Sequence, residues 1–297
     1  MRVTPLLLAA CVLVAAMSAA AAPGSVQSWK PKGISSPKFE SHPAFDPLTG
    51  DLYFVRSSPA FQGWRILVSR CGPEGWSEPQ PVPFAGDGVE ADPWFTADGK
   101  SIYFISTRSL NGVKRTNLDI WRVDREAAGT WGAPVRLPEP VNSEGAEWFP
   151  RPSADGWLYF GSDRKGGLGS TDIWRARAGA DGSWSIENLG PAINTAGDEY
   201  EPLPSPDGKR MIVMADGDLY ESRRAGDGWS AREKLAAEVN AAGMEVGALF
   251  SPGGTSLLFS RDTQGPDSGE FFLLREGGEE AWPPECPPRS PAGTSNK

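Results

Sequence analysis

The sequence is short of the residues that most catalytic and metal sites use. It contains one histidine and three cysteines among 297 residues. It has no G-x-S-x-G elbow, no H-E-x-x-H pair and no cysteine pair at metal-ligand spacing. The stretch KGGLGST is similar to a phosphate-binding loop, but a strand pattern follows it where such a loop requires a helix. We therefore expect neither a cofactor nor a bound metal.

Long hydrophobic runs are missing after the first two dozen residues, so we expect no integral membrane segment. Residues 1–22 have the pattern of a secretory signal peptide, because Arg2 precedes an apolar run from Leu6 to Met17 that ends in small residues. We expect cleavage near Ala20–Ala22 and a periplasmic or secreted location. The stretch LAAC, ending at Cys11, has the form of a lipoprotein signal, but the leader before it is short and the apolar run continues past it. We therefore expect no lipid anchor.

The chain also lacks the excess of positive charge that favours nucleic acids or anionic membrane surfaces as partners. Lysine and arginine number 29 against 38 aspartate and glutamate residues, which gives a net charge of −9. Turn-forming and aromatic residues, in contrast, are abundant, with 35 glycines, 28 prolines and 12 tryptophans. This composition indicates many turns, short strands and aromatic packing.

Five segments of the sequence share one pattern. Each opens with a glutamate, has a turn glycine nine or ten residues later, and continues with a β-rich strand such as SIYFIS or WLYFGS. A third strand carries an acid and two apolar residues, as in Asp119-Ile120-Trp121, and a tryptophan strand closes the unit. The opening glutamates are Glu40, Glu90, Glu147, Glu199 and Glu245. The closing tryptophans are Trp76, Trp131, Trp184, Trp229 and Trp282.

A repeat of this length predicts an all-β fold, a β-propeller of four-stranded antiparallel blades. Radial stacking buries the aromatic faces of the blades and protects their edges. Residues 40–285 form five complete units, so we predict five blades. Residues 23–39 either close the ring by adding a strand to the last blade or belong to an irregular sixth blade. Residues 286–297 are rich in proline and polar residues and read as a disordered tail.

The segments EWFPRPSADGWLYFGSDRKGGLGSTDIW and NTAGDEYEPLPSPDGKR resemble the WD-like propeller repeats of the TolB family, of the kind also found attached to OmpA-type domains. The resemblance extends from residue 40 to about residue 285. It implies the fold and leaves the function open, because such repeats serve as protein-binding platforms, carbohydrate-associated modules and accessory domains of enzymes.

Strand polarity divides the loops between two faces of the predicted propeller. If each glutamate opens the innermost strand, the Asp-Gly turns lie at the opposite end, and the long loops and inter-blade links gather at the glutamate end. We therefore expect binding on this long-loop face, around the axial mouth. The glutamates could form an acidic funnel there. Alternatively, each could accept loop amides or pair with an arginine such as Arg108 or Arg164, which repeat symmetry favours.

The repeat loses its symmetry two residues after each glutamate, where the sequence has His42, Asp92, Phe149, Glu201 and Gly247. His42, Asp92 and Glu201 have the side chains of a metal site, but nothing fixes their distances, so we interpret them as polar residues beside a wet channel. Neighbouring aromatic residues could stack on a sugar, anchor a peptide or pack between blades. The predicted ligand-binding residues are His42, Asp92, Trp94, Glu147, Trp148, Arg151, Glu199, Tyr200, Glu201 and Glu245.

These features favour a non-catalytic, monomeric interaction protein of the cell envelope that binds an envelope protein or a polysaccharide. The alternative is a glycoside hydrolase, which would need two non-equivalent buried carboxylates at a fixed separation. A structural envelope protein without a discrete ligand is a third interpretation. On the binding interpretation, alanine at Asp92 and Glu201 weakens partner capture and leaves the thermal midpoint nearly unchanged.

Cys71 and Cys286 remain after signal-peptide cleavage, in a compartment that permits a disulfide. A bond between them would join the first and last blades, which are neighbours in a closed ring. Outer strands of adjacent blades diverge, however, and Cys286 lies in the predicted tail. The sequence therefore leaves the pairing open.

Overall fold

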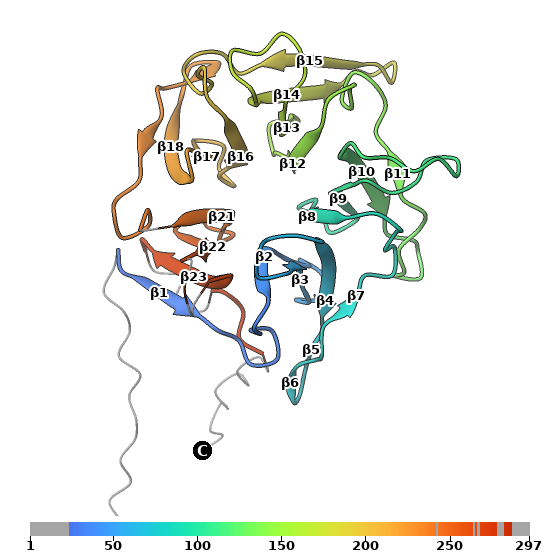
Figure 1. Ribbon diagram of the computed structural model, residues 1–297, viewed down its shortest axis with the longest axis vertical. Helices are drawn as coiled ribbons and strands as arrows, with labels where there is room; N and C mark the ends of the chain where they lie inside the picture. Colours follow the sequence, from blue (N-terminus) through green and yellow to red (C-terminus); the bar gives the residue numbers. More distant parts are fainter. Residues whose placement is uncertain (1–23, 242, 264, 266–267, 278–281, 287–297) are drawn as a thin grey trace, which may run out of the picture.

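The computed structural model describes residues 24–241, 243–263, 265, 268–277 and 282–286 of the chain. Every regular element in these residues is a β-strand. Five sheets lie around a central axis, and one two-stranded sheet stands apart from them (Figure 1). Each of the five sheets is antiparallel and places one end strand at the centre of the ring. The predicted all-β, five-bladed propeller is confirmed.

The blades follow one another along the chain, and the strands of each blade are named from the innermost outwards. Blade 1 contains β2 (Phe39–Phe45), β3 (Leu52–Ser57), β4 (Arg65–Ser69) and β7 (Gln80–Pro81). Blade 2 contains β8 (Glu90–Phe95), β9 (Ser101–Ser106), β10 (Asp119–Asp124) and β11 (Val135–Arg136). Blade 3 contains β12 (Glu147–Pro152), β13 (Leu158–Ser162), β14 (Asp172–Ala178) and β15 (Trp184–Asn188).

Blades 4 and 5 depart from this simple order. Blade 4 contains β16 (Glu199–Pro204), β17 (Arg210–Ala215) and β18 (Asp218–Ala225), and β18 pairs at different points with β19 (Gly228–Trp229) and β20 (Glu233–Lys234). Blade 5 contains β21 (Met244–Phe250), β22 (Ser256–Asp262), β23 (Glu270–Arg275) and β1 (Val26–Trp29).

The ring closes through the N-terminal strand. β1 pairs antiparallel with β23, with Val26 opposite Leu274 and Trp29 opposite Phe271 (Figure 1). The outermost strand of the last blade therefore comes from the segment before the first blade. Of the two arrangements that the sequence left open for this segment, the structure has the ring-closing strand, and the described residues contain no sixth blade.

Three of the five closing tryptophans do not lie where the sequence placed them. Trp184 in β15 and Trp229 in β19 belong to the strands that end the order of their sheets. Trp76 lies in a separate hairpin formed by β5 (Cys71–Gly72) and β6 (Gly75–Trp76), Trp131 forms an isolated bridge with Arg125, and Trp282 is outside any strand. In blades 1 and 4 the chain forms a short hairpin after the third strand, and the outer strand follows a few residues later. The predicted role of the tryptophans in aromatic packing agrees better with the structure, since Trp121, Trp174 and Trp229 are buried.

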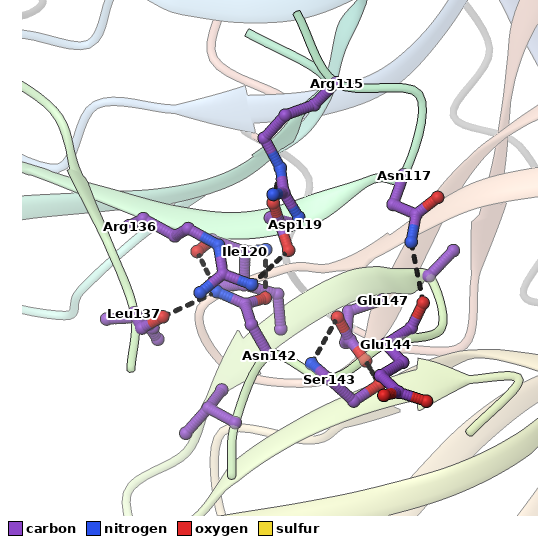
Figure 2. A network of polar contacts seen from close by, with 12 residues as sticks. Arg115, Asn117, Asp119, Ile120, Arg136, Leu137, Asn142, Ser143, Glu144 and Glu147 are labelled. Atoms are coloured by element: carbon purple, nitrogen blue, oxygen red, sulfur yellow. Dashed lines mark hydrogen bonds and ion pairs between the residues drawn. The ribbon is translucent and has the colours of Figure 1, made fainter. Parts of the chain in front are cut away.

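Asparagine side chains fasten the links between blades. The Asn142 Oδ1 atom accepts the Ile120 N–H at 2.6 Å, and its amide nitrogen donates to the carbonyls of Ile120 at 2.9 Å and Leu137 at 2.8 Å (Figure 2). Asn194 and Asn240 bond the equivalent residues of the next two blades in the same way. These links, which the sequence assigned to a binding face, are therefore fixed to the third strand of the blade that they leave.

A disulfide joins Cys71 to Cys286, with their Cα atoms 5.5 Å apart. The β5–β6 hairpin carries Cys71 beyond the diverging outer strands, and Cys71 can therefore reach Cys286 (Figure 1). Cys286 is thus attached to blade 1 and is not the start of a free tail. Residues 287–297, the proposed signal peptide and Cys11 lie outside the described residues. None of the described residues forms a helix that is long and apolar enough to cross a membrane.

Candidate functional site

The five opening glutamates are fully buried, with no exposed side-chain surface. Each forms an ion pair with an arginine, and each arginine also donates to the backbone carbonyl of the residue six positions before the glutamate. The pairs are Glu40–Arg56, Glu90–Arg108, Glu147–Arg164, Glu199–Arg232 and Glu245–Arg261. The carbonyls belong to Ile34, Phe84, Val141, Ile193 and Val239. We call these five arrangements the blade clamps.

The blade clamps show that the acidic funnel is wrong. Glu147, Glu199 and Glu245 are covered by their arginine partners and by the preceding link, so they cannot contact a ligand at the axial mouth. The alternative, pairing with Arg108 and Arg164, is what the structure has. In blade 4 the usual arginine position is taken by Ala215 and Asp216, and Arg232 reaches Glu199 from the segment between β19 (Gly228–Trp229) and β20 (Glu233–Lys234) instead.

The second residue after each glutamate has left-handed backbone geometry. The φ angles are 50° at His42, 58° at Asp92, 53° at Phe149, 52° at Glu201 and 68° at Gly247. The strand pairing shifts at this point in every blade, which marks a β-bulge. Left-handed geometry is costly for residues other than glycine and persists only where the surroundings hold it in place. The bulges bring these five residues together around the axis.

Three of these residues contact one another directly. The His42 Nε2 atom lies 3.4 Å from Asp92 Oδ1 and 3.4 Å from Glu201 Oε1. The other carboxylate oxygens accept backbone N–H groups across blade boundaries, Asp92 from Phe149 at 3.1 Å and Glu201 from Gly247 at 2.6 Å. A Cβ atom at Gly247 would collide with the backbone nitrogen of His42, so only glycine fits the fifth position.

Arg151 completes this axial cluster, which we define as His42, Asp92, Arg151 and Glu201. The guanidinium carbon of Arg151 lies 4.5 Å from the centre of the Trp94 ring, and its Nη1 group donates to the Pro150 carbonyl at 3.2 Å. The four side chains are 4%, 1%, 3% and 2% exposed, so the wet channel expected from the sequence is wrong. Burial raises the pKa of Asp92 and lowers that of Arg151, while their mutual attraction opposes both shifts. No group of three or more potential ligands in the described residues could hold a metal ion.

Four buried carboxyls give folding stability a distinct pH dependence. Burial raises the pKa values of Glu40, Asp92, Glu147 and Glu245 above their ordinary values. Carboxyls in the unfolded chain titrate near pH 4, at about 3.9 for aspartate and 4.3 for glutamate. The folded protein therefore holds protons at pH values where the unfolded chain has lost them. The contribution of these groups is complete below about pH 4 and is lost as the pH rises through their folded pKa values.

We accordingly expect the free energy of unfolding at pH 5 to equal or exceed that at pH 7. Exposed carboxyls with lowered pKa values, such as Asp98 and Asp207, make the folded protein less stable as the pH falls, but only below about pH 4. Urea unfolding followed by circular dichroism at the two pH values provides the measurement. A protein less stable at pH 5 by more than about 1 kcal/mol would contradict the burial effect.

An apolar cavity lies on the axis at the face opposite the long loops. Its volume is about 520 Å³, and the ends of the five innermost strands and the turns that follow them form its wall. None of the described residues that line it carries a charge. The lining residues are Ala44, Phe45, Pro47, Trp94, Phe95, Thr96, Ala97, Pro152, Ser153, Ala154, Pro204, Ser205, Pro206, Leu249, Phe250, Ser251, Pro252 and Trp282.

The hydroxyl groups of this lining mainly serve its turns. Thr96 donates to Asp98 at 2.7 Å, and Ser205 donates to Asp207 at 2.7 Å. The Ser251 hydroxyl accepts the Ser256 N–H at 3.0 Å. The cavity therefore offers a ligand mostly aromatic and proline surface and few free hydrogen-bonding groups.

The structure separates the predicted site residues into four groups. Trp94 alone lines the cavity, and it also stacks on Arg151 of the axial cluster. His42, Asp92, Arg151 and Glu201 lie buried in that cluster, and the three glutamates belong to blade clamps. Trp148 and Tyr200 pack edge-to-face at 5.7 Å, and the Tyr200 hydroxyl is 3.2 Å from Thr171 Oγ1, so they stabilise the junction of blades 3 and 4.

The sequence interpretation missed most of the cavity wall. Phe45, Phe95 and Phe250 recur five residues after the opening glutamates, and Pro152 and Pro204 occupy the equivalent positions. This recurrence of large apolar residues beside a turn was the available signal. Loop length does not indicate this wall, because the turns on this face are short.

No protein-family model matches the chain, and no curated protein matches it. Among solved structures, it is similar to a protein assigned as TolB from Agrobacterium tumefaciens, at 21% identity over 72% of this chain and 88% of the other, with a TM-score of 0.39. An α-L-arabinofuranosidase from Lactobacillus brevis is 13% identical over 80% and 90% of the chains, with a TM-score of 0.49. Zg3597, a family 117 glycoside hydrolase from Zobellia galactanivorans, is 11% identical over 87% and 93%, with a TM-score of 0.48. Likenesses at this level carry no argument about function.

Proposed function

We propose that this protein is a non-catalytic binding protein of the periplasm or the extracellular space, and that it takes an apolar group of its ligand into the axial cavity. The observation that carries the proposal is the lining, whose described residues include aromatic and proline side chains and none that is charged. A volume of about 520 Å³ falls within the range of about 300–1,000 Å³ that is typical of ligand sites. Burial of apolar surface then supplies the affinity.

The lining favours a protein ligand over a glycan. A sugar brings many hydroxyl groups, and each needs a hydrogen-bond partner when it leaves water. The cavity provides few, because Thr96, Ser205 and Ser251 bond to their own turns. Large apolar side chains of an envelope protein require no such partners.

Three observations weigh against the hydrolase alternative. The two non-equivalent carboxylates near the axis, Asp92 and Glu201, are 1% and 2% exposed. Each also accepts a backbone N–H group, which fixes it in a structural role. A general acid or base must reach the substrate or an attacking water. Neither carboxylate lines the cavity where a substrate would lie.

Blocking the cavity with a charge is expected to abolish binding of an apolar probe. Ala154 is exposed and lines the cavity, so Ala154→Arg places a cation at its wall without disturbing the core. We expect the affinity for the uncharged dye N-phenylnaphthylamine, measured by fluorescence titration, to fall by about tenfold or more, since each tenfold change corresponds to about 1.4 kcal/mol.

The matched control is Ala180→Arg, which adds the same charge to an exposed turn of the same blade, outside the cavity. This variant should bind the dye as the parent protein does. Equal dye affinity in all three proteins, or no saturable binding to the parent, would overturn the proposed site. Hydrolysis of a panel of nitrophenyl glycosides by the parent would restore the enzyme interpretation.

A further inference from the structure

The last described segment, Trp282–Cys286, connects the axial cavity with the outer edge of blade 1. Trp282 lines the cavity, is 8% exposed, and meets the ring of Phe45 edge-on at 6.3 Å. It belongs to a core cluster that includes Ile34 and Phe54 from the start of the ring and Phe271 from the last blade. Trp282 therefore fills the junction between the first and last blades.

Two closures join these two blades, and they differ in kind. The first is the backbone pairing of β1 with β23, which ties the N-terminal segment into blade 5. The second is the Cys71–Cys286 disulfide, which ties the C-terminal segment to blade 1. Because the β1–β23 pairing does not involve the cysteines, the ring keeps one closure when the disulfide is broken.

The segment Trp282–Cys286 has no strand of its own. Packing of Trp282 anchors one end, and the bond from Cys286 to Cys71 anchors the other. Ordering a chain segment costs conformational entropy, which contacts must offset. Once the bond is broken, the entropy of ordering this segment must be offset by its packing alone.

The disulfide is placed where a reductant can reach it. Cys71 and Cys286 are both half-buried, and Cys71 lies in the β5–β6 hairpin at the outer end of blade 1 (Figure 1). Access to the sulfur atoms is one of the factors that determine how fast a disulfide exchanges with thiols. Trp282, only four residues from Cys286, therefore links an accessible bond to the cavity wall.

We propose that the Cys71–Cys286 disulfide is a redox-controlled latch, whose reduction releases Trp282 from the wall of the axial cavity and weakens the binding of apolar ligands. The reductant is a dithiol, free or carried by a partner protein. One of its thiolates attacks a sulfur of the disulfide and forms a mixed disulfide, and one cysteine leaves as a thiolate. Its second thiol then releases the other cysteine, so the dithiol is oxidised by two electrons and both cysteines end as thiols. The effect on ligand binding rests on the proposed function, whereas the release of Trp282 does not.

Release of Trp282 is tested by fluorine NMR of protein labelled with 5-fluorotryptophan, with the Trp282 resonance assigned from a Trp282→Phe variant. Dithiothreitol is expected to move this resonance to the position of a solvent-exposed tryptophan and to leave those of Trp121 and Trp174 unchanged. The Cys71→Ser/Cys286→Ser variant should show the released position with or without dithiothreitol. An unmoved Trp282 resonance would overturn the latch. A general collapse of all tryptophan resonances would also overturn it, because the disulfide would then hold the whole propeller.

The effect on the cavity is tested with N-phenylnaphthylamine in the same samples. We expect reduction to weaken dye binding by about tenfold, because the cavity wall then loses one large aromatic residue. The double serine variant should match the reduced protein and should not respond to dithiothreitol. Release of Trp282 with unchanged dye affinity would refute control of the site. Failure of the oxidised protein to bind the dye would refute the proposed function, while the NMR result would still decide whether Trp282 is released.

Discussion

Replacing Arg164 with alanine is expected to lower the free energy of unfolding by about 3–5 kcal/mol, the usual cost of removing one partner of a buried ion pair. The guanidinium of Arg164 donates to Glu147 at 2.9 Å and to the carbonyls of Pro140 at 2.6 Å and Val141 at 2.5 Å. Glu147 would keep the hydroxyls of Ser143 and Ser162 and lose the arginine with which it forms an ion pair. Two link carbonyls would lose their donor as well.

The matched control is Arg122→Ala. Arg122 pairs with Asp124 at 2.7 Å, but the two side chains are 43% and 57% exposed, so the loss should stay within about 1 kcal/mol. Urea unfolding of both variants provides the comparison. The pair Arg164→Met/Glu147→Gln removes both buried charges and should recover part of the stability. Equal losses for Arg164→Ala and Arg122→Ala would show that the blade clamps contribute no more than surface ion pairs.

The blade clamps explain why the opening glutamate recurs in every unit. Each clamp ties the innermost strand of one blade to the link that arrives from the preceding blade, so the repeated element is the joint rather than a binding group. Blade 4 supports this interpretation. It lacks an arginine at the usual position, yet Arg232 supplies the same bond to Glu199 and the same bond to a link carbonyl. The geometry is kept although the sequence position differs.

The fold could be predicted because its signals are local and recur five times. Turn glycines, β-rich strands and opening glutamates repeat at blade length, and random sequence does not produce such a repeat. The pairing of Glu90 with Arg108 and of Glu147 with Arg164 could also be anticipated, because repeat-equivalent acids seldom form a specific site. The Cys71–Cys286 disulfide could not be predicted, because it requires the β5–β6 hairpin. The strand pattern of the sequence does not reveal the direction in which this hairpin points.

The exposure of the axial residues was predicted wrongly for two physical reasons. The first is the β-bulge in each innermost strand, which adds a residue and changes the face to which later side chains point. Strand alternation therefore placed His42 beside an open channel, whereas it is 4% exposed. The second is loop length. The long links are occupied by the bonds of residues such as Asn142 and Asn194, so their length does not indicate a binding surface.

Replacing both Asp92 and Glu201 with alanine is expected to lower the free energy of unfolding by about 5 kcal/mol, which includes the loss of the anions beside the buried Arg151. The sequence alone suggested that this change would leave stability untouched, and the geometry of the axial cluster reverses that expectation. Both carboxylates lie within 3.4 Å of the His42 Nε2 atom, and both attract the buried Arg151. Their loss would leave Arg151 without a neighbouring anion and would remove the acceptors of the Phe149 and Gly247 N–H groups.

Two further variants separate charge from hydrogen bonding in this cluster. Asp92→Asn/Glu201→Gln keeps an acceptor for each backbone N–H and removes both charges, so its loss should be smaller than that of the alanine pair. Glu74→Ala/Glu78→Ala makes the same change of net charge at two exposed positions and should stay within about 1 kcal/mol. The measurements are urea unfolding and titration with N-phenylnaphthylamine. If the double alanine protein melts as the parent does and loses only ligand capture, the two acids are binding residues and the axial cluster is not what holds the five blades at their centre.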